Sequence, residues 1–357
     1  MTIPMLRERR EPCVLHHRAT GRLARYRRER GTISYVLVFF IFMALAFAAF
    51  SVDIGHYFLA QDELQTAADA AAIAGAVALN SGTSTPGWNT AVAAAASAVR
   101  LNTSDGVVLT NAAIQSGYWN LTGSPAGMQA STITPGTYDS PAVQVTVSRA
   151  TGLNGGQLVF FFAPLFGVYT TAVTATAVAV VSAPGYVGPG GLFPVALGKC
   201  LLDLYWNAQT GAPKIDPSTG QAYTFQITND ALYGSCSGGQ WTSFATDAND
   251  VPTVRALMSS GNPSGLSIGD SIWIEPGTKT TLYSSVPINV DVLVPVVQSL
   301  ASSTETILGF AAFHIDLAVG GSGKYIQGHL ITNFKVATGS GQGGPFYGAY
   351  VPPRLAQ

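Results

Sequence analysis

Charged side chains are scarce in this sequence, and their signs are separated along it. Asp, Glu, Lys and Arg make up 10% of the 357 residues, with a formal net charge of −1. Nine of the 18 basic residues fall among the first 30 residues against three glutamates, a balance of +6, and the remainder carries −7. A basic tail can indicate nucleic-acid binding, but arginines directly before an apolar segment are more simply a signal of membrane topology and suit anionic lipid headgroups. We expect no nucleic-acid partner.

The motifs of common catalytic sites are lacking too. The run from Gly320 to Lys324 departs from a phosphate-binding loop at Ala318 and at Tyr325, so a hairpin turn is the better interpretation. The segments Gly261 to Gly265 and Gly234 to Gly238 do not have the spacing of a nucleophile elbow. We therefore predict that the chain is not an enzyme.

Histidine and carboxylate groups do not form a recognisable metal motif. His314 and Asp316 share one face of a predicted strand, and His329 is expected opposite them across a hairpin. A metal site needs a third or fourth ligand at defined spacing, and none is visible. We predict neither a metal nor another cofactor.

Only three cysteines are present, Cys13, Cys200 and Cys236. If the last two lie in an oxidising compartment, they are expected to pair, which would leave no free thiol as a nucleophile there. Closing this loop would contribute about 4 kcal/mol in the loop-entropy model. Two buried free thiols are the alternative.

The longest apolar segment is Gly31 to Val52, which contains no charged residue. Its 22 residues reach about 33 Å as a helix, enough to cross a bilayer core of about 30 Å. The basic residues precede it, and no Lys or Arg follows until Arg100. The positive-inside rule then places residues 1–30 in the cytoplasm as a basic tail, residues 31–53 in the membrane, and the bulk of the chain outside.

Two cleavage events are alternatives to a retained anchor. A signal peptidase site at Ala44 to Ala46 would leave an unusually long basic region and apolar run. A prepilin-type leader would be cut after Gly31, but Val36 stands where the resembling pilins carry Glu. We expect the anchor to be retained.

Beyond Asp53 the chain continues in strong helix formers without proline, which predicts one uninterrupted helix into residues 60–79. A second helix is predicted over residues 88–101, giving a helical hairpin. Ala68, Ala72 and Ala76 form a ridge of small side chains at a spacing of four, which allows close helix packing. This ridge is expected to pack within the same chain or to contact another subunit, and the two do not exclude each other.

The remaining sequence predicts strands. Residues 142–149 and 170–182 alternate and are rich in β-branched side chains, and Leu158 to Phe166 is interpreted as a short helix buried in the core. A Gly- and Pro-rich linker is expected at residues 184–191, followed by a β-rich, sandwich- or barrel-like domain at residues 192–357 that ends in a flexible tail. The fold class is therefore α+β and membrane-anchored, with residues 54–183 forming a helical hairpin and a small α/β module.

One combination of residues resembles the amino-terminal region of the TadG-like proteins of the tight-adherence (Tad, or Flp) pilus-assembly system. It is a basic tail ending at Gly31, one span, and then a fixed motif of residues. The motif comprises Val52, Asp53, Gly55, Tyr57, Leu64, Gln65, Ala67, Ala68, Asp69, Ala70, Ala71, Ala72, Ala74, Gly75 and Ala76. The resemblance extends from about Arg22 to Ala183. Many relatives carry a metal-binding Asp-x-Ser-x-Ser loop that this chain lacks, so metal-dependent adhesion is not implied.

The resemblance implies a bacterial inner-membrane component of pilus assembly or secretion, with its bulk in the periplasm. Its partners would be other assembly proteins or pilins, with oligomerisation through the small-residue helix as a further possibility. Asp53 matches the family motif and is expected to lie in the headgroup region at the outer end of the span. Asp69 is expected either to be an exposed carboxylate on the helix face or to contact a partner helix or a group in the folded domain.

Two other functions stay open at this point. The first is a minor pilin or pseudopilin cleaved at Gly31. The second is a membrane-tethered β domain that acts as an enzyme or binds carbohydrate on an exposed aromatic platform, for which Trp241, Trp273 and Tyr283 are candidates.

Overall fold

The structure is a computed structural model that describes residues 32–79, 86–228, 232–248, 250–275, 279–337, 339–340 and 343–356. The chain divides into two compact units, residues 1–51 and 52–357. The division falls inside a helix, and the second unit holds both the predicted α/β module and the predicted β-rich domain.

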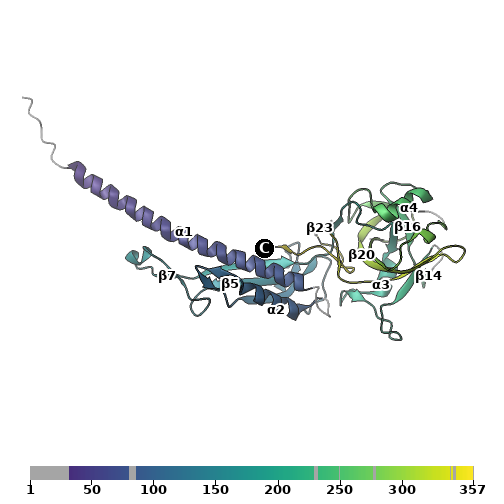
Figure 1. The fold of residues 1–357 in the computed structure, drawn as a ribbon, viewed down its shortest axis with the longest axis horizontal. Coiled ribbons are helices and arrows are strands. Elements are labelled where there is room, and N and C mark those ends of the chain that lie inside the picture. The colour runs from purple at the N-terminus through teal and green to yellow at the C-terminus, as the bar shows by residue number, and fades with distance from the viewer. Residues whose placement is uncertain are drawn as a thin grey trace, which may run out of the picture. The chain divides into compact units, whose positions relative to one another are not determined.

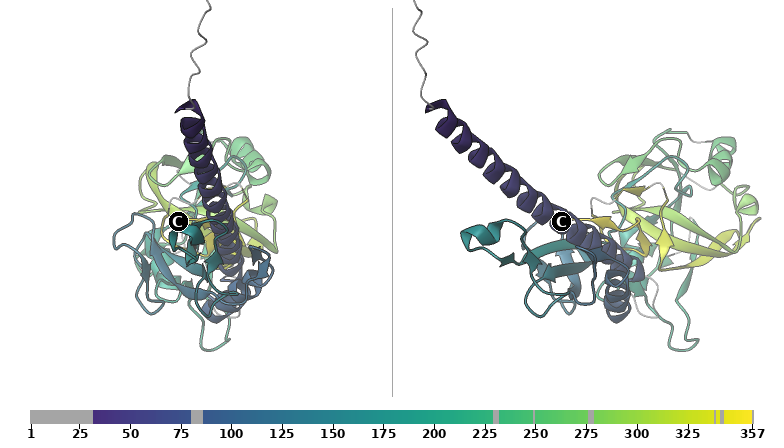
Figure 2. Two further views of the ribbon diagram at one scale, coloured as in Figure 1. Left: turned by 90° about the vertical axis from the view of Figure 1, so that its left-hand side faces the viewer. Right: turned by 60° about the vertical axis from the view of Figure 1, so that its left-hand side comes forward.

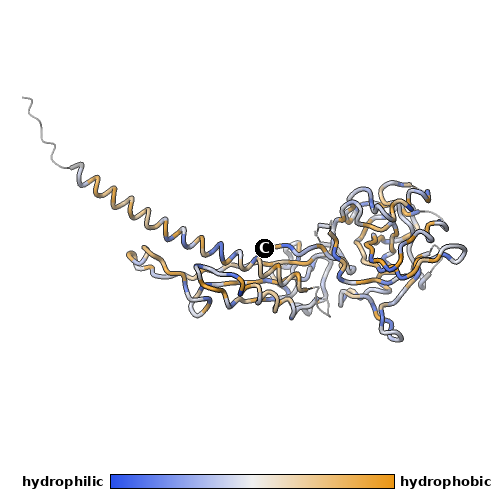
Figure 3. The backbone as a smooth tube through the Cα atoms, in the orientation of Figure 1, coloured by the Kyte–Doolittle hydropathy of each residue, from blue (hydrophilic) through white to orange (hydrophobic). Residues whose placement is uncertain are grey.

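The first element, α1 (Thr32–Ala78), is one uninterrupted helix of 47 residues. Its apolar composition and length suit a membrane span, and the large apolar side chains between Tyr35 and Phe50 are exposed. Figure 3 shows this apolar character along the helix. The predicted continuous helix is confirmed.

In the second unit, α1 and α2 (Trp88–Val99) cover one face of a five-stranded antiparallel sheet with the order β25-β8-β5-β3-β4. Figures 1 and 2 show these layers. The strands are β3 (Ala113–Asn120), β4 (Met128–Gln129), β5 (Asp139–Arg149), β8 (Val173–Val180) and β25 (Arg354–Leu355). Alternate residues of β5 and β8 are buried under the helices, as a period of two requires. Two short hairpins extend this module, namely β1 (Thr103–Ser104) with β2 (Val107–Val108), and β6 (Leu158–Val159) with β7 (Thr170–Thr171).

The carboxy-terminal region is built on a seven-stranded sheet, β13-β21-β20-β18-β16-β10-β19, in which β19 also pairs with β20. This extra pairing closes the strands from β20 to β19 into a barrel, consistent with the predicted barrel-like fold. The strands are β10 (Val195–Gly198), β13 (Thr224–Ile227), β16 (Gln240–Phe244), β18 (Ser271–Ile274), β19 (Val290–Val297), β20 (Thr304–Val319) and β21 (Tyr325–Leu330). Successive residues of β19 and β20 enter two different hydrophobic clusters, so both faces of these strands are buried.

Short elements complete this region. The helices are α3 (Lys199–Tyr205) and α4 (Val251–Ser260), with the 3-10 turn η2 (Tyr283–Ser285). The short strands are β11 (Trp206–Asn207), β12 (Ala212–Pro213), β14 (Leu232–Tyr233), β15 (Cys236–Ser237), β22 (Phe334–Lys335) and β24 (Ala349–Tyr350). Within this region the sequence favours helices only at residues 254–259 and 295–302. The first prediction is confirmed by α4, the second is wrong because β19 continues to Val297, and α3 is not predicted.

Two segments expected to be irregular pair as strands. Within residues 184–191, β9 (Tyr186–Val187) pairs with β17 (Leu266–Ser267) and with β23 (Gly339–Ser340). The expected flexible tail after Pro353 is wrong, because β25 pairs with the outer edge of β8.

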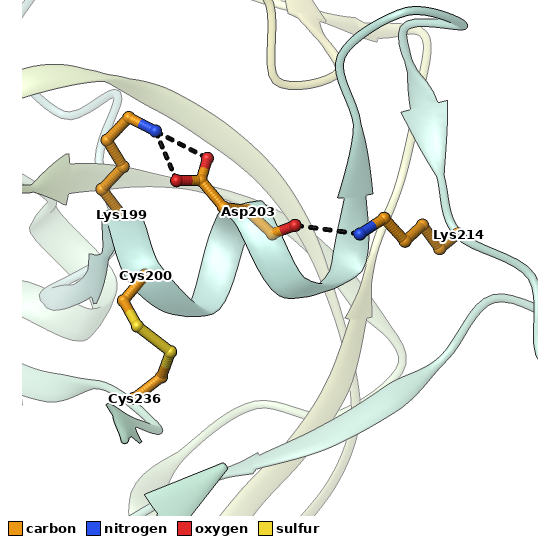
Figure 4. Close-up of a disulfide and its surroundings, with 5 residues drawn as sticks. All are labelled: Lys199, Cys200, Asp203, Lys214 and Cys236. Atoms are coloured by element: carbon orange, nitrogen blue, oxygen red, sulfur yellow. Dashed lines mark hydrogen bonds and ion pairs between the residues drawn. A yellow bond between two sulfur atoms is a disulfide. The ribbon is translucent and has the colours of Figure 1, made fainter. Parts of the chain in front are cut away.

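A disulfide joins Cys200 of α3 to Cys236 of β15, with Cα atoms 5.4 Å apart (Figure 4). Beside it, Lys199 pairs with Asp203. At the other end of α3, Lys214 Nζ donates to the carbonyl oxygens of Asp203 and Leu204. A cation at the carbonyl end of a helix satisfies acceptors that lack helical partners. The disulfide thus fixes a helix whose carbonyl end is also held.

Removing the disulfide should weaken the carboxy-terminal region. For the double substitution Cys200→Ser and Cys236→Ser we expect the free energy of unfolding to fall by about 3–4 kcal/mol, because a loop of this length is no longer closed in the unfolded chain. Denaturant titration of the detergent-solubilised chain under oxidising conditions measures this. Cys13→Ser is the control. Equal midpoints for the double variant and the control would contradict the prediction.

Candidate functional site

The most distinctive polar arrangement surrounds Asp53, the first charged residue after the apolar run. Its side chain is only 3% exposed. Oδ1 accepts a hydrogen bond from the backbone N–H of Phe161 (2.8 Å), and Oδ2 accepts from Phe162 (3.0 Å) and Ala163 (2.6 Å). We call this set of contacts the Asp53 clamp. It joins α1 to a loop more than 100 residues later in the sequence.

The local sequence explains why that loop needs an anion. The 3-10 turn η1 (Ala163–Phe166) begins at the loop, carries Pro164 in its first turn and has no side-chain cap of its own. The first N–H groups of a helical turn lack partners within it and attract negative charge. Asp53 supplies that charge from α1, a contact that the sequence did not predict, and its position in the headgroup region stays a prediction.

A second set of contacts lies one turn further along α1. His56 Nε2 is 2.9 Å from Asp105 Oδ1, and the His56 ring lies 5.0 Å from that of Phe161. The backbone N–H of Asp105 donates to Glu63 Oε2 (2.6 Å). Arg149, which is buried at the end of β5, lies 3.6 Å from Asp105 Oδ2. Residues 53, 56 and 63 share one face of α1, and this face holds the β1–β2 turn and the η1 loop.

Further along the same helix the motif residues are packed inside the chain. The side chains of Leu64, Ala68 and Ala72 are fully buried. A Cβ on Gly75 would meet Val143 Cγ1 at 2.9 Å and Ala91 O at 3.1 Å, so glycine allows α1 to approach α2 and β5 closely. The small-residue ridge therefore packs within its own chain, which is the first of the two alternatives.

The remaining motif residues differ in exposure. Gln65 Nε2 donates to Asp69 Oδ1 (2.7 Å) and to the carbonyl of Thr176 in β8 (3.3 Å), so Asp69 orients an amide that binds the sheet. Tyr57 is half-buried against the core of the module. Gly55 is exposed, and a Cβ there would meet no atom within 4 Å. Nothing in the structure explains a glycine at this position.

Leu158 to Phe166, expected in the core, is largely exposed apart from Leu158. We name residues 158–171, formed by β6, η1 and β7, the apolar hairpin. Figure 1 shows β7 beyond the end of β5, away from the carboxy-terminal region. The exposed large apolar residues of the hairpin are Val159, Phe161, Phe162, Leu165, Phe166, Val168 and Tyr169. The prediction that this apolar segment is buried in the core is therefore wrong.

The histidines and carboxylates weighed as metal ligands lie on strands β19, β20 and β21 of the carboxy-terminal region. His314 and His329 are paired across β20 and β21, as predicted, with ring centroids 5.2 Å apart. His314 Nδ1 lies 2.6 Å from Asp291 Oδ1, and His329 Nδ1 lies 3.1 Å from Asp316 Oδ2. Among the described residues, no three His, Cys, Asp or Glu side chains are grouped so that they could hold a metal ion.

The proposed aromatic platform is wrong for two of its three members. Trp241 and Tyr283 are buried in the core of the carboxy-terminal region, where their rings pack edge to face with centroids 5.4 Å apart. Trp273 is half-buried. These side chains do not present an exposed stacking surface for a sugar.

A cavity of about 330 Å³ lies among Tyr118, Asp139, Lys199, Asp203 and Tyr347. Burial and the nearby Asp203 raise the pKa of Tyr347 to about 12. Burial acts to raise the pKa of Asp139 as well, but hydrogen bonds outweigh it and lower that pKa. The donors to Asp139 are Gly136 N, Gln129 Nε2 and Asn120 Nδ2. Since Lys199 pairs with Asp203, the carboxylates and the ammonium group here already have partners.

Comparison with known families identifies the amino-terminal part of the chain. Residues 31–78 match the Tad family model, described as Flp pilus-assembly TadE/G-like, and residues 74–179 match the Tad_C model, described as Tad-like Flp pilus-assembly. The two matches run from the start of the apolar segment to the end of β8. No curated protein and no solved structure matches the chain. The resemblance to TadG-like proteins of Flp pilus assembly is therefore confirmed, and the motif residues lie within it.

The Asp53 clamp can be tested by removing its acceptor. Asp53→Ala removes the shared acceptor of three backbone N–H groups, and the loss of a hydrogen bond to a charged group costs about 1.5–3 kcal/mol. We expect faster hydrogen exchange at Phe161 to Ala163 and faster chymotrypsin cleavage within the apolar hairpin. Asp62→Ala, on the exposed face of the same helix, is the matched control. Exchange rates equal to those of the control would contradict the clamp.

The buried carboxyl of Glu275 predicts a pH dependence of stability. The side chain is fully buried, with Lys279 Nζ 3.5 Å from Oε2, and burial raises its pKa more than Ser243 and Lys279 lower it. The folded chain therefore binds the proton more tightly than the unfolded chain, whose pKa is about 4.3. The stability that Glu275 contributes is fully present at pH values below its pKa in the unfolded chain. It is lost as the pH rises through the higher pKa that Glu275 has in the folded chain. We expect this loss in the wild type and not in Glu275→Gln, measured by denaturant titration at several pH values; parallel profiles would contradict it.

Proposed function

We propose that this chain is a non-enzymatic component of Flp pilus assembly that is anchored in the bacterial inner membrane by α1 and acts through protein contacts. The observation that carries the proposal is the match of residues 31–179 to two pilus-assembly families, combined with a helix that continues from the apolar segment into the folded module. In this proposal residues 1–30 stay in the cytoplasm and the residues after the span lie in the periplasm, as the charge distribution favours.

The burial of the small-residue ridge bears on where partners bind. Because Leu64, Ala68 and Ala72 contact the chain's own core, a partner helix would have to displace α2 or the sheet to reach them. We therefore place the partner contact on the opposite face of α1, where Ile73 and Val77 are exposed apolar residues. Of the motif residues, Val52, Gly55 and Ala70 are exposed, and Asp69 is half-buried.

The cleaved minor pilin is the second candidate. The exposed apolar side chains from Tyr35 to Phe50 fit contact with lipid, and they fit equally the packing of helices from many copies in a fibre. The two functions differ in covalent structure. A cleaved minor pilin would begin at Thr32, whereas the anchored protein would keep the residues before it.

Mass and amino-terminal sequence of the protein from fractionated membranes, with protease added to spheroplasts, separate these functions. We expect an intact amino terminus and digestion from outside down to the span. A chain that begins at Thr32 would overturn the retained anchor, and full protection from external protease would overturn the topology.

The partner face can be tested by photo-crosslinking in cells. We expect a photoreactive residue at Val77 to give an adduct, and one at Tyr138, which is similarly exposed on the same module, to give none.

Asp69→Ala tests the motif carboxylate in the same cells. Normal piliation of this variant together with equal adduct yields at the two positions would contradict the proposed contact.

A further inference from the structure

The apolar hairpin exposes more apolar surface than a loop in water should. Phe161 is 65% exposed, Leu165 81% and Phe166 76%, and four further large apolar residues of the hairpin are also exposed. Seven large apolar side chains are thus exposed on one short hairpin, whereas the largest apolar patch on a typical soluble monomer is only about 300–600 Å². Patches of this kind mark contact with a protein or a membrane.

The sequence around the hairpin favours a lipid surface. No charged residue occurs from Ala150 to Gly198, and the hairpin lies within that range. Phe161, Phe166 and Tyr169 belong to the side-chain types that concentrate at membrane interfaces and in interfacial anchors. A charged side chain would be costly at that depth, and the hairpin has none.

The Asp53 clamp fixes where the hairpin lies relative to the membrane. Asp53 follows Val52, the last residue of the charge-free run, and it binds the backbone of Phe161 to Ala163 directly. Three N–H donors replace the water that the carboxylate would otherwise need, so Asp53 can lie at the hydrocarbon boundary. The exposed Ile54, Phe58 and Leu59 continue the apolar surface of α1 past this point.

We propose that the apolar hairpin is a second membrane contact, which inserts Phe161, Leu165 and Phe166 into the outer boundary of the same leaflet from which α1 emerges. The inference rests on the membrane anchoring in the proposed function. The hairpin does not span the bilayer; it lies in the interface and fixes the rotation of the folded module about the axis of α1. Two contacts with one leaflet restrain an orientation that a single helix leaves free.

Depth-dependent fluorescence quenching in liposomes tests the proposal on the full chain. Cys13 is replaced by Ser, and a bimane label is attached to Leu165→Cys in vesicles that contain lipids with a nitroxide at the top of the acyl chain. We expect at least twofold quenching at this position. The matched control is Tyr138→Cys, which is 48% exposed and lies next to the opposite end of β5. Equal quenching by the nitroxide lipid at Leu165→Cys and at Tyr138→Cys would overturn the hairpin contact.

A label at Phe42→Cys, within the apolar run, separates the failure of this inference from that of the proposed anchor. Quenching at Phe42 by deep nitroxides without quenching at Leu165 would refute the hairpin contact alone. A lack of quenching at Phe42 would refute the anchor and with it this inference. Protection of Leu165 from an aqueous quencher in cells, but not in liposomes of the pure protein, would show that a protein partner covers the hairpin, and would also overturn the membrane contact.

A polar variant supplies a second measurement. Because Phe161, Leu165 and Phe166 are mostly exposed, replacing all three by Ser should leave the melting temperature unchanged. We expect a label at Val168→Cys in this background to lose more than half of its quenching by the shallow nitroxide lipid. Unchanged quenching would mean that these side chains do not hold the hairpin in the leaflet.

Discussion

A single carboxylate determines how the anchor meets the folded part of this protein. Asp53 provides charge where three amides at the start of η1 have no other acceptor, and these amides provide solvation where the side chain is buried. Each side of the contact would be unstable alone in an apolar setting. Below it, His56 and Glu63 hold the β1–β2 turn through Asp105. The helix therefore leaves its apolar segment already bound to two loops.

Beyond these polar contacts, the packing of α1 depends on small side chains. Alanines and Gly75 bring the helix close to α2 and β5, and the interior positions of β5 and β8 are Val and Ala, which fill a shallow layer. The same motif thus has two roles along one helix: charge at the exit from the apolar segment, and close packing in the turns that follow. Its match to the Tad family coincides with both.

Much of this architecture could be predicted from the sequence because its determinants are local. A breaker-free run predicts α1, and strict alternation predicts β5 and β8. The failures have a common cause, which is that burial and strand pairing are tertiary properties. Phe161 and Phe166 have core-like composition, yet no element covers them. Trp241 and Tyr283 resemble surface aromatics in a loop-rich sequence, yet they pack together in the core. The Asp53 clamp could not be predicted from the sequence either. Asp53 and the η1 loop lie more than 100 residues apart, and nothing near either of them indicates that the two are in contact.

The pairing of β25 with β8 sets the order in which the parts of the chain can be completed during synthesis. Strand β8 is an edge of its sheet until Arg354 and Leu355 arrive, and an open edge is a template for association with other chains. All of the carboxy-terminal barrel is translated between these two strands. The sheet of the module is therefore completed only by residues that are translated after the barrel, so the edge of β8 stays open while the barrel is synthesised. A chain that stops before β25 would carry a complete α1 and a sheet with an unprotected edge.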